Sequence, residues 1–172
     1  SEQYWKRLQK AIIGKHNPEN VILLEIDPSK QNTYIDFLVT KHHLGIEPVH
    51  LGDLILRGKK LWYKKNDVEI PVHRIYNRVI FDELLGKPDL KTDFHLTEEV
   101  EVEWAGHPNW FYYISKYTMP FLDSDVVPEC KFLSDYTTLP PDLENYVLKP
   151  LFSFSGSGVI FNITEPDILS IP

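Results

Sequence analysis

The sequence predicts an α/β fold with a mainly parallel sheet, flanking helices and, later in the chain, an antiparallel pair of strands. Residues 21–26 form a nearly all-apolar run between two X-Pro turns, as in a strand that is covered on both faces. A helical stripe and a second strand-like run follow, which gives the order of a parallel βαβ unit. Residues 146–151 and 159–163 are short apolar runs joined by a Ser/Gly-rich loop, and they predict an antiparallel hairpin.

The first elements follow from hydrophobic periodicity. Residues 3–14 carry apolar side chains at helical spacing and end in Gly14, which predicts an amphipathic helix. Residues 34–44 show a second helical stripe that ends at Gly45. Strand character resumes at residues 48–54. We therefore expect a sheet with at least one helix packed on it.

Residues 54–72 predict a β-hairpin or a small meander, because apolar runs alternate with turn residues at Gly58 and Asn66-Asp67. This segment also holds a group of four lysines, namely Lys59, Lys60, Lys64 and Lys65. The lysines allow two interpretations: a patch that binds anions, or charges that keep an exposed hairpin soluble.

The remaining elements are shorter. We predict a strand at 72–80, a short helix at 81–85, a loop at 87–99, a strand at 100–104, a helix at 110–117 and a connector at 120–128. Thr164 is predicted to cap a helix with Pro166 in its first turn. Because the sequence stops at Pro172, before three turns of that helix, we expect the chain to be part of a longer protein.

The composition narrows the classes of function. The 18 basic and 25 acidic side chains give a net charge of −7, so neither nucleic acid nor an anionic membrane surface is expected as a partner. No apolar run approaches the roughly 18 residues that would span a bilayer. Cys130 is the only cysteine, which excludes an intrachain disulfide and fits a reducing, cytoplasmic location. The seven histidines lack metal-ligand spacing, so we expect no metal site.

A candidate nucleotide site lies between the last two predicted strands. An ammonium such as that of Lys149 is costly inside an apolar strand unless it has an anionic partner. The following loop, residues 153–158, has little side-chain bulk, so its backbone amides can approach phosphate oxygens. The predicted nucleotide-binding residues are Lys149, Ser153, Ser155, Gly156, Ser157 and Gly158. The alternative role for Lys149 is a buried structural ion pair. If residues 153–158 instead form a lid over a nucleotide, we expect them to be mobile when no nucleotide is bound.

The stretch Tyr146-Val147-Leu148-Lys149-Pro150 and its glycine loop resembles the ATP-grasp superfamily, in which a "vvKP" lysine and a glycine-rich loop hold the ATP phosphates. Upstream, Ser115-Lys116 and the later Val-Val-Pro are similar to the start of the family's ATP-binding domain, although Ser115 replaces the usual acid. The run from Arg74 to Arg78 resembles the substrate-side domain of glutathionylspermidine-synthase-like, circularly permuted members.

This resemblance implies two domains. Residues 1–115 would be a pre-ATP-grasp-like, substrate-side α/β domain, and residues 116–172 would begin the ATP-binding subdomain with its antiparallel lid. It also implies ATP and Mg as cofactors of the longer protein, and a small carboxylate as substrate. The oligomeric state is not predicted.

Arg74, Asn77 and Arg78 are the candidate substrate-binding residues. Arg74, Tyr76 and Arg78 share one face of a strand by its period of two. Two guanidinium groups and a phenol suit a carboxylate or phosphate ligand. The same groups would be purely structural if they paired with acids such as Asp82, so both interpretations stand.

Two functions therefore remain open. In the first, the chain belongs to an ATP-dependent carboxylate–amine ligase, is inactive alone, and supplies phosphate-side ATP contacts and part of the acid-substrate site. In the second, it is a non-catalytic protein-interaction domain with an acidic surface and an exposed aromatic face.

Overall fold

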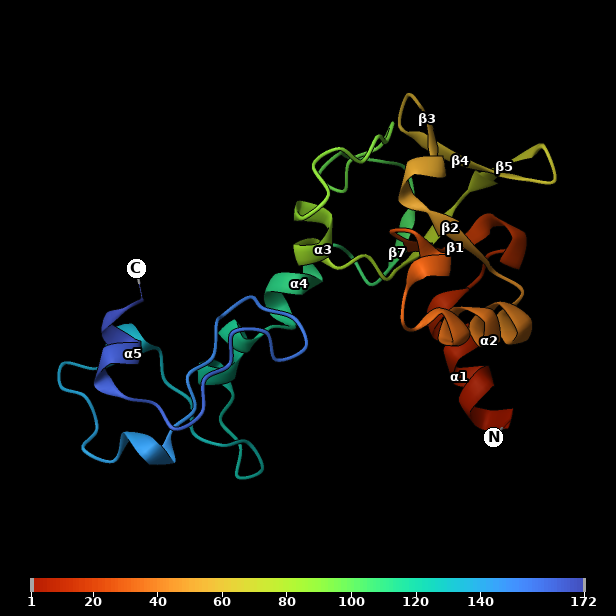
Figure 1. Ribbon diagram of the computed structural model, residues 1–172. Helices are drawn as coiled ribbons and strands as arrows, with labels where there is room; N and C mark the ends of the chain where they lie inside the picture. The colour runs from red at the N-terminus through yellow and green to blue at the C-terminus, as the bar shows by residue number, and fades with distance from the viewer. Residues whose placement is uncertain (1, 172) are drawn as a thin grey trace. The chain divides into compact units, whose positions relative to one another are not determined.

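The computed structural model describes residues 2–171 and divides into two compact units that meet between Pro108 and Asn109 (Figure 1). We call residues 2–108 the sheet unit and residues 109–171 the loop-rich unit. The division falls earlier in the chain than the predicted boundary after residue 115. The protein is α/β, with a four-stranded parallel sheet, a three-stranded antiparallel sheet and helices, as the coarse prediction expected.

The parallel sheet has the strand order β2-β1-β6-β7. Its strands are β1 (Val21–Glu25), β2 (Glu47–His50), β6 (Arg74–Asn77) and β7 (Glu103–Ala105). All three neighbouring pairs are parallel, and Leu23 of β1 is in register with Pro48 and Tyr76. The predicted βαβ unit is thus confirmed, whereas the predicted strands at 72–80 and 100–104 are shorter than expected.

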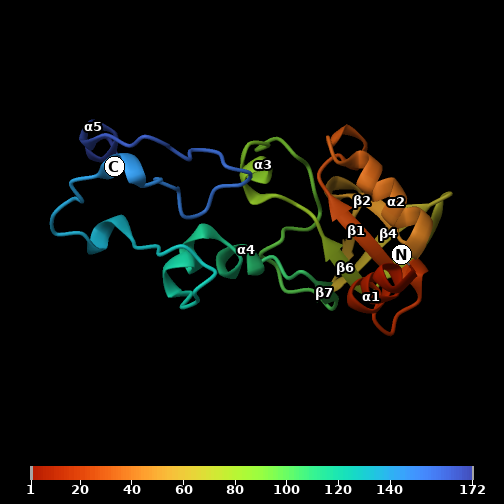
Figure 2. The ribbon, with the colours of Figure 1, turned by 90° about the horizontal axis from the view of Figure 1, so that it is seen from below.

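Strand β1 is buried on both faces because every one of its residues is apolar except Glu25 at its end. On one face, Val21 and Leu23 pack in a cluster with Phe37 of α2 (Tyr34–Leu44) and with Ile12 of α1 (Glu2–Ile12). Figure 2 shows both helices beside the sheet. Helix α2 ends where Gly45 takes the left-handed conformation, with φ at 72°, as the Leu-Gly pair predicted.

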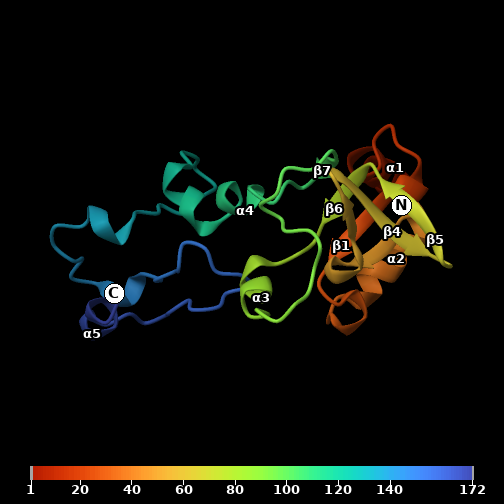
Figure 3. The same cartoon turned by 90° about the horizontal axis from the view of Figure 1, so that it is seen from above.

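The antiparallel sheet is the predicted meander, formed by β3 (Ile55–Arg57), β4 (Lys60–Lys65) and β5 (Val68–Val72). Figure 1 labels all three strands, and Figure 3 shows β4 and β5 in the sheet unit from another side. Asn66 and Asp67 both have positive φ, which suits a two-residue hairpin turn. Two of the four lysines have carboxylate partners, since Lys59 pairs with Glu99 and Lys65 with Glu47. The soluble-hairpin interpretation accounts for these two residues without an anion.

The second core cluster lies on the other face of β1. Ile22 and Leu24 pack there with Tyr63, Ile75 and Phe94 among other side chains. Phe94 is fully buried, although it belongs to the polar segment 87–99 that was predicted as loop. This loop, which follows α3 (Phe81–Leu85), therefore closes one side of the core.

The loop-rich unit contains short helices and turns. Helix α4 (Trp110–Tyr113) is shorter than the predicted helix at 110–117, since residues 116–121 form a 3₁₀ helix. Helix α5 (Glu165–Leu169) begins with the predicted Thr164 cap, whose hydroxyl and backbone N–H lie 2.6 and 2.8 Å from the Asp167 carboxylate.

The prediction of two strands at 146–151 and 159–163 is wrong in extent. Only one antiparallel bridge forms, in which Leu148 and Ile160 exchange both backbone hydrogen bonds at 3.0 and 2.9 Å. Tyr146, Val147 and Leu151 are each about 40% exposed, at 41, 41 and 40%, so no sheet neighbour covers this run. Without such a covered face, the ladder stops after one pair.

Candidate functional site

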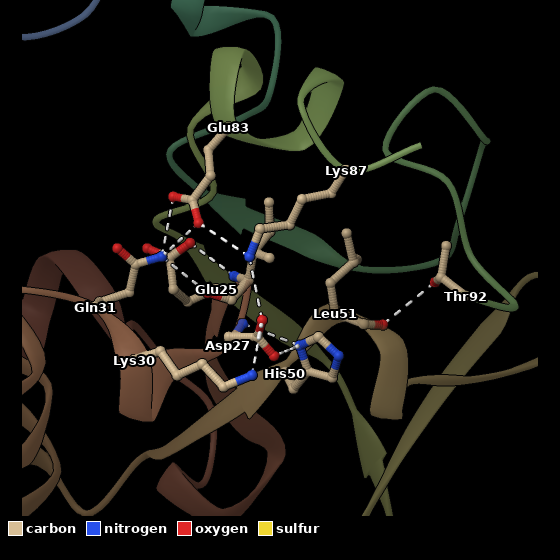
Figure 4. A network of polar contacts seen from close by, with 10 residues as sticks. Glu25, Asp27, Lys30, Gln31, His50, Leu51, Glu83, Lys87 and Thr92 are labelled. Atoms are coloured by element: carbon tan, nitrogen blue, oxygen red, sulfur yellow. Dashed lines mark hydrogen bonds and ion pairs between the residues drawn. The ribbon is translucent and has the colours of Figure 1, made fainter. Parts of the chain in front are cut away.

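The carboxyl edge of the parallel sheet is the first candidate region. The chain leaves β1 through α2 to β2 on one side, and later returns to β6 on the other side of β1. The carboxyl ends of β1 and β6 therefore flank a point where the strand order reverses. Open α/β sheets bind ligands at such points. Figure 4 shows the polar side chains gathered at this edge.

Asp27 follows β1 and has a left-handed backbone, with φ at 47°. Its Oδ2 accepts a hydrogen bond from Lys87 Nζ at 3.1 Å and lies 3.6 Å from Lys30 Nζ. Its backbone N–H donates to His50 Nδ1 at 3.0 Å, so that nitrogen acts as the acceptor. The hydrogen bond from Lys87 is the main cause that lowers the Asp27 pKa below its usual value.

Gln31 and Glu83 connect helix α3 to this edge (Figure 4). The Gln31 side-chain amide donates to the Ile26 carbonyl at 2.9 Å and to both Glu83 oxygens at 3.0 Å. Lys87 Nζ lies 3.4 Å from Glu83 as well, so a single ammonium sits between two carboxylates from different elements.

Glu25 is the least exposed member of the network, at 3%. Its Oε1 accepts a hydrogen bond from the Ile26 N–H at 2.7 Å, and no donor within residues 2–171 reaches its second oxygen. Burial raises the Glu25 pKa to about 7, the Ile26 hydrogen bond opposes this, and the nearby Glu83 charge adds to it. Glu25 thus titrates near neutral pH.

The predicted substrate residues do not form one group, because Arg74 and Arg78 lie at opposite ends of β6. Arg74 donates to the carbonyls of Ile12 and Ala11 at 2.8 and 3.0 Å and to Glu103 at 2.8 Å. These partners satisfy the guanidinium and hold the end of α1. For Arg74 the contacts favour the structural interpretation.

Arg78 and Asn77 lie at the carboxyl edge. Arg78 Nη1 donates to Asp36 and to the Tyr76 hydroxyl, both at 3.2 Å, and its guanidinium lies 5.4 Å from the Phe37 ring centre. The Asn77 Oδ1 accepts the Val79 N–H at 3.3 Å. Arg78 has donors beyond those two contacts, so it can still orient an acid.

Residues 149–158 of the loop-rich unit form the second candidate region. The expectation that Lys149 is buried in an apolar strand is wrong: its side chain is exposed, and within the described residues it makes no hydrogen bond or ion pair. A buried structural ion pair is thereby excluded as its role. Lys116 instead donates to the Ser153 carbonyl and hydroxyl at 2.6 and 2.9 Å.

The glycine loop presents unpaired backbone amides. Ser155, Gly156 and Gly158 have positive φ, at 49, 81 and 70°. The Ser157 N–H donates to Phe154 within the loop, whereas the N–H groups of those three residues reach no acceptor in the described chain. Successive amides in such a conformation form a concave site for anions. The structure brings Lys116 to this loop, which the sequence pattern did not predict.

Position 158 also needs glycine because there is no room for a larger side chain beside Pro150. A Cβ atom at this position would lie 2.7 Å from Pro150 Cγ, whereas one at Gly156 would meet nothing within 4 Å. The loop therefore packs back on the proline that follows Lys149, and the Lys-Pro and glycine parts of the motif are in contact.

Comparisons with known proteins gave no match, either to a protein-family model or to a curated protein. Within residues 2–171, no three histidine, cysteine or acidic side chains converge as metal ligands. No helix in the same range is long and apolar enough to cross a membrane.

Sequence reasoning missed the carboxyl-edge network of Glu25, Asp27, Gln31, His50 and Lys87. One signal was available, because Glu25 and Asp27 end a buried strand, where a parallel sheet exposes its ligand-binding edge. Glu83 and Lys87 had no such signal, since the hydrogen bonds that bring them to β1 span more than 50 residues of chain.

Proposed function

We propose that this chain contributes the phosphate-side ATP contacts, and part of an acid-substrate site, to an ATP-dependent carboxylate–amine ligase of the ATP-grasp type. The observation that supports this best is the loop at residues 153–158. Its three unpaired amides lie in a segment that packs on Pro150, and the residue before Pro150 is Lys149, whose exposed ammonium has no partner among the described residues. Backbone amides and a lysine are the donors that polyphosphates need.

In the proposed reaction, a substrate carboxylate attacks the γ-phosphorus of ATP, ADP leaves, and an acyl phosphate forms. The amine then attacks the acyl carbon, phosphate leaves, and an amide bond results. Lys149 and the loop amides would neutralise charge on the phosphates during the first step. Arg78, rather than the predicted pair of arginines, would orient the acid.

Magnesium would accompany ATP as the counter-ion of its phosphates. Since no cluster of three candidate ligands occurs among the described residues, we assign no metal ligand to this chain and no step to a metal-bound group.

Calorimetric titration with Mg-ATP tests this proposal. We expect weak affinity and no ligase activity from this chain alone, because one lysine and one loop contact only the phosphate end. Lys149→Ala should weaken binding by roughly 10- to 150-fold, which corresponds to the value of a hydrogen bond to a charged group. The matched control is Lys64→Ala, which removes another exposed lysine from the sheet unit. Equal affinity in wild type and Lys149→Ala would contradict the proposed site.

The alternative is a protein-interaction domain, and the apolar surface of the loop-rich unit favours it. Large exposed side chains there include Trp110, Tyr113, Ile114, Phe121 and Val126, which are 51 to 89% exposed. Clusters of exposed apolar side chains often mark interaction sites. Amide hydrogen exchange at residues 149–158 separates the two functions, because the interaction domain predicts no change on addition of Mg-ATP.

A further inference from the structure

Strand β2 is an edge strand of the parallel sheet. It pairs with β1 on one side, and on its other side no strand within residues 2–171 pairs with its backbone. Two surface clefts run along this free edge, and both are lined by Glu47, Pro48 and His50 of β2 and by Asp53 shortly after it. The unpaired N–H and C=O groups of an edge strand are a template for a further extended segment.

The two clefts lie on opposite faces of the sheet. Helix α2 packs on the face of β1 that carries Leu23, and the meander packs on the face that carries Leu24. The α2 cleft, of about 250 Å³, is walled by α2 side chains such as Leu38. The hairpin cleft, of about 560 Å³, is walled by Lys64 and Lys65 of β4. Successive side chains of a strand point to opposite faces, so a strand added to β2 would place its side chains in the two clefts alternately.

The hairpin cleft has lysine charge that the chain itself does not neutralise. Lys41 and Lys65 both pair with the single carboxylate of Glu47. Lys64 has no ion pair or hydrogen bond with any described residue. Together the clefts hold these three lysines against Glu47 and Asp53, an excess of one positive charge, in a chain whose net charge is −7. An acidic side chain of a ligand would complement this excess.

The α2 cleft has a different chemistry. Its walls are largely carbon, since they include the Tyr34 ring, the Leu38 side chain and two proline rings, Pro28 and Pro48. Apolar side chains of a ligand would lose water-exposed surface there. The two clefts therefore favour an extended segment in which apolar and acidic residues alternate.

Pro48 argues against a second copy of this chain as the occupant. Proline has no backbone N–H and is typical of edge strands, where it limits extension of the sheet. If β2 paired with β2 of a second copy, each of the two four-residue strands would bring a proline into the ladder. The same excess of lysine charge would also face itself. A short peptide from another molecule has neither disadvantage.

We propose that the free edge of β2 binds an extended acidic peptide segment as an added strand. Apolar side chains of the peptide lie in the α2 cleft, and its acidic side chains lie in the hairpin cleft near Lys64. Backbone hydrogen bonds to β2 supply affinity, and the two clefts supply specificity. The site lies wholly in the sheet unit, so it does not depend on the proposed ATP contacts of the loop-rich unit.

The test is an NMR titration of the whole chain at pH 7 with the capped peptide Val-Glu-Val-Glu-Val. Low ionic strength is used because salt screens exposed charges. The reporters are the backbone amides of Glu47, Val49 and His50 in β2. The control peptide Val-Lys-Val-Lys-Val reverses the charge.

Two further peptides test strand pairing itself. One is N-methylated on its valines and the other on its glutamates, so that each has lost the N–H groups along one edge. Only one edge of a bound peptide can face β2. We expect one of these peptides to bind about tenfold or more weaker than the parent, because it has lost several backbone hydrogen bonds, and the other to bind like the parent.

Two pairs of matched variants test the clefts. Lys64→Glu reverses a charge in the hairpin cleft, and Lys60→Glu makes the same change on the same strand outside both clefts. Leu38→Ala removes apolar surface from the α2 cleft, and Val39→Ala is its control outside both clefts, since the two residues are 40 and 39% exposed. All four side chains are exposed, so the variants should fold.

We expect saturable shifts of the β2 amides with the acidic peptide. Lys64→Glu and Leu38→Ala should each weaken binding by about threefold or more, and each control by less than about twofold. The proposal would be overturned by the absence of a saturable shift, by equal affinity for the basic peptide, by full binding of both N-methylated peptides, or by equal losses in a variant and its control. Shifts of the same amides on dilution of the protein alone would show that a second copy occupies the edge, which also overturns it.

Discussion

The sheet unit and the loop-rich unit differ most in what they bury. Every buried apolar side chain of the core within residues 2–171 belongs to the sheet unit except Ile163, which is 6% exposed. The loop-rich unit instead relies on local turns, aromatic contacts such as Tyr117 on Phe152, and one β-bridge. Because burial of apolar surface is the main stabilising term in folding, the sheet unit should hold most of the protein's stability.

The largest expected effect of this difference is in amide hydrogen exchange. Amides of β1 and β6 should open only with global unfolding, whereas those of residues 116–121 and 153–158 should open locally. We expect the exchange rates of the two groups to differ by on the order of 1,000-fold or more. Exchange followed by mass spectrometry measures this. Equal protection of the amides in both units would show that the loop-rich unit is more stable than its small buried apolar surface predicts.

A pair of leucine substitutions sharpens the same comparison. Leu24 is 0% exposed in the core, and Leu151 is 40% exposed in the loop-rich unit. Leu24→Ala should lower the free energy of unfolding by about 2–5 kcal/mol, the cost of a cavity in a packed core. Leu151→Ala should change it by no more than about 0.5 kcal/mol. Urea denaturation followed by circular dichroism gives both values, and similar losses would contradict the contrast.

Glu25 gives the sheet unit a pH dependence of unusual sign. Its pKa is raised from 4.5 to about 7 in the folded state, so the folded protein keeps a proton that the unfolded chain loses. The free energy of unfolding should therefore fall as pH rises from about 4.5 to 7, by about 3 kcal/mol at most. Glu25→Gln should remove this fall and be more stable than wild type at pH 8. Denaturation curves at several pH values test it.

Glu103 serves as the control of opposite sign. Its hydrogen bond with His16 is the main cause that lowers the Glu103 pKa to about 2, and its hydrogen bond with Lys15 is the second. The stability that the Glu103 carboxylate contributes is therefore fully present above its ordinary pKa of 4.5 and is lost as pH falls toward 2. Glu103→Gln should destabilise the protein at neutral pH and have no effect at pH 2. If Glu25→Gln and Glu103→Gln changed the free energy of unfolding with the same dependence on pH, the opposite pKa shifts of the two residues would be wrong.

The contrast between the units also explains what the sequence could predict. The apolar run 21–26 predicted β1 because a strand that is buried on both faces has apolar residues at consecutive positions of the sequence. Turn residues at Gly58 and Asn66 likewise revealed the meander. The run 146–151 gave the same apolar signal, but Val147 and Leu151 stay exposed, and periodicity cannot show whether a partner surface exists.

The candidate sites divide in the same way. Lys149 and the loop at 153–158 could be predicted as a candidate site because their chemistry is local in sequence. Glu25 and Glu83 were missed, because only tertiary structure brings α3 over the end of β1. Arg74 and Arg78 looked alike by strand period, yet their partners come from α1 in one case and α2 in the other. The period of two in a strand predicts which face of the sheet a side chain lies on, but it does not predict which neighbouring elements that side chain contacts.

The smallest expected effect separates two glycines of the same loop. Gly156 and Gly158 both have positive φ, so alanine at either costs roughly 1–2 kcal/mol of local strain. Only at Gly158 would the new Cβ also lie 2.7 Å from Pro150, which adjoins Lys149. Because the side chains of the loop-rich unit are mostly exposed, the segment can shift to relieve that contact, and the shift would move Lys149 away from the loop amides. We therefore expect Gly158→Ala to weaken Mg-ATP binding severalfold more than Gly156→Ala in calorimetric titrations. Equal losses would mean that strain alone matters and that the Lys-Pro segment is not positioned by the loop.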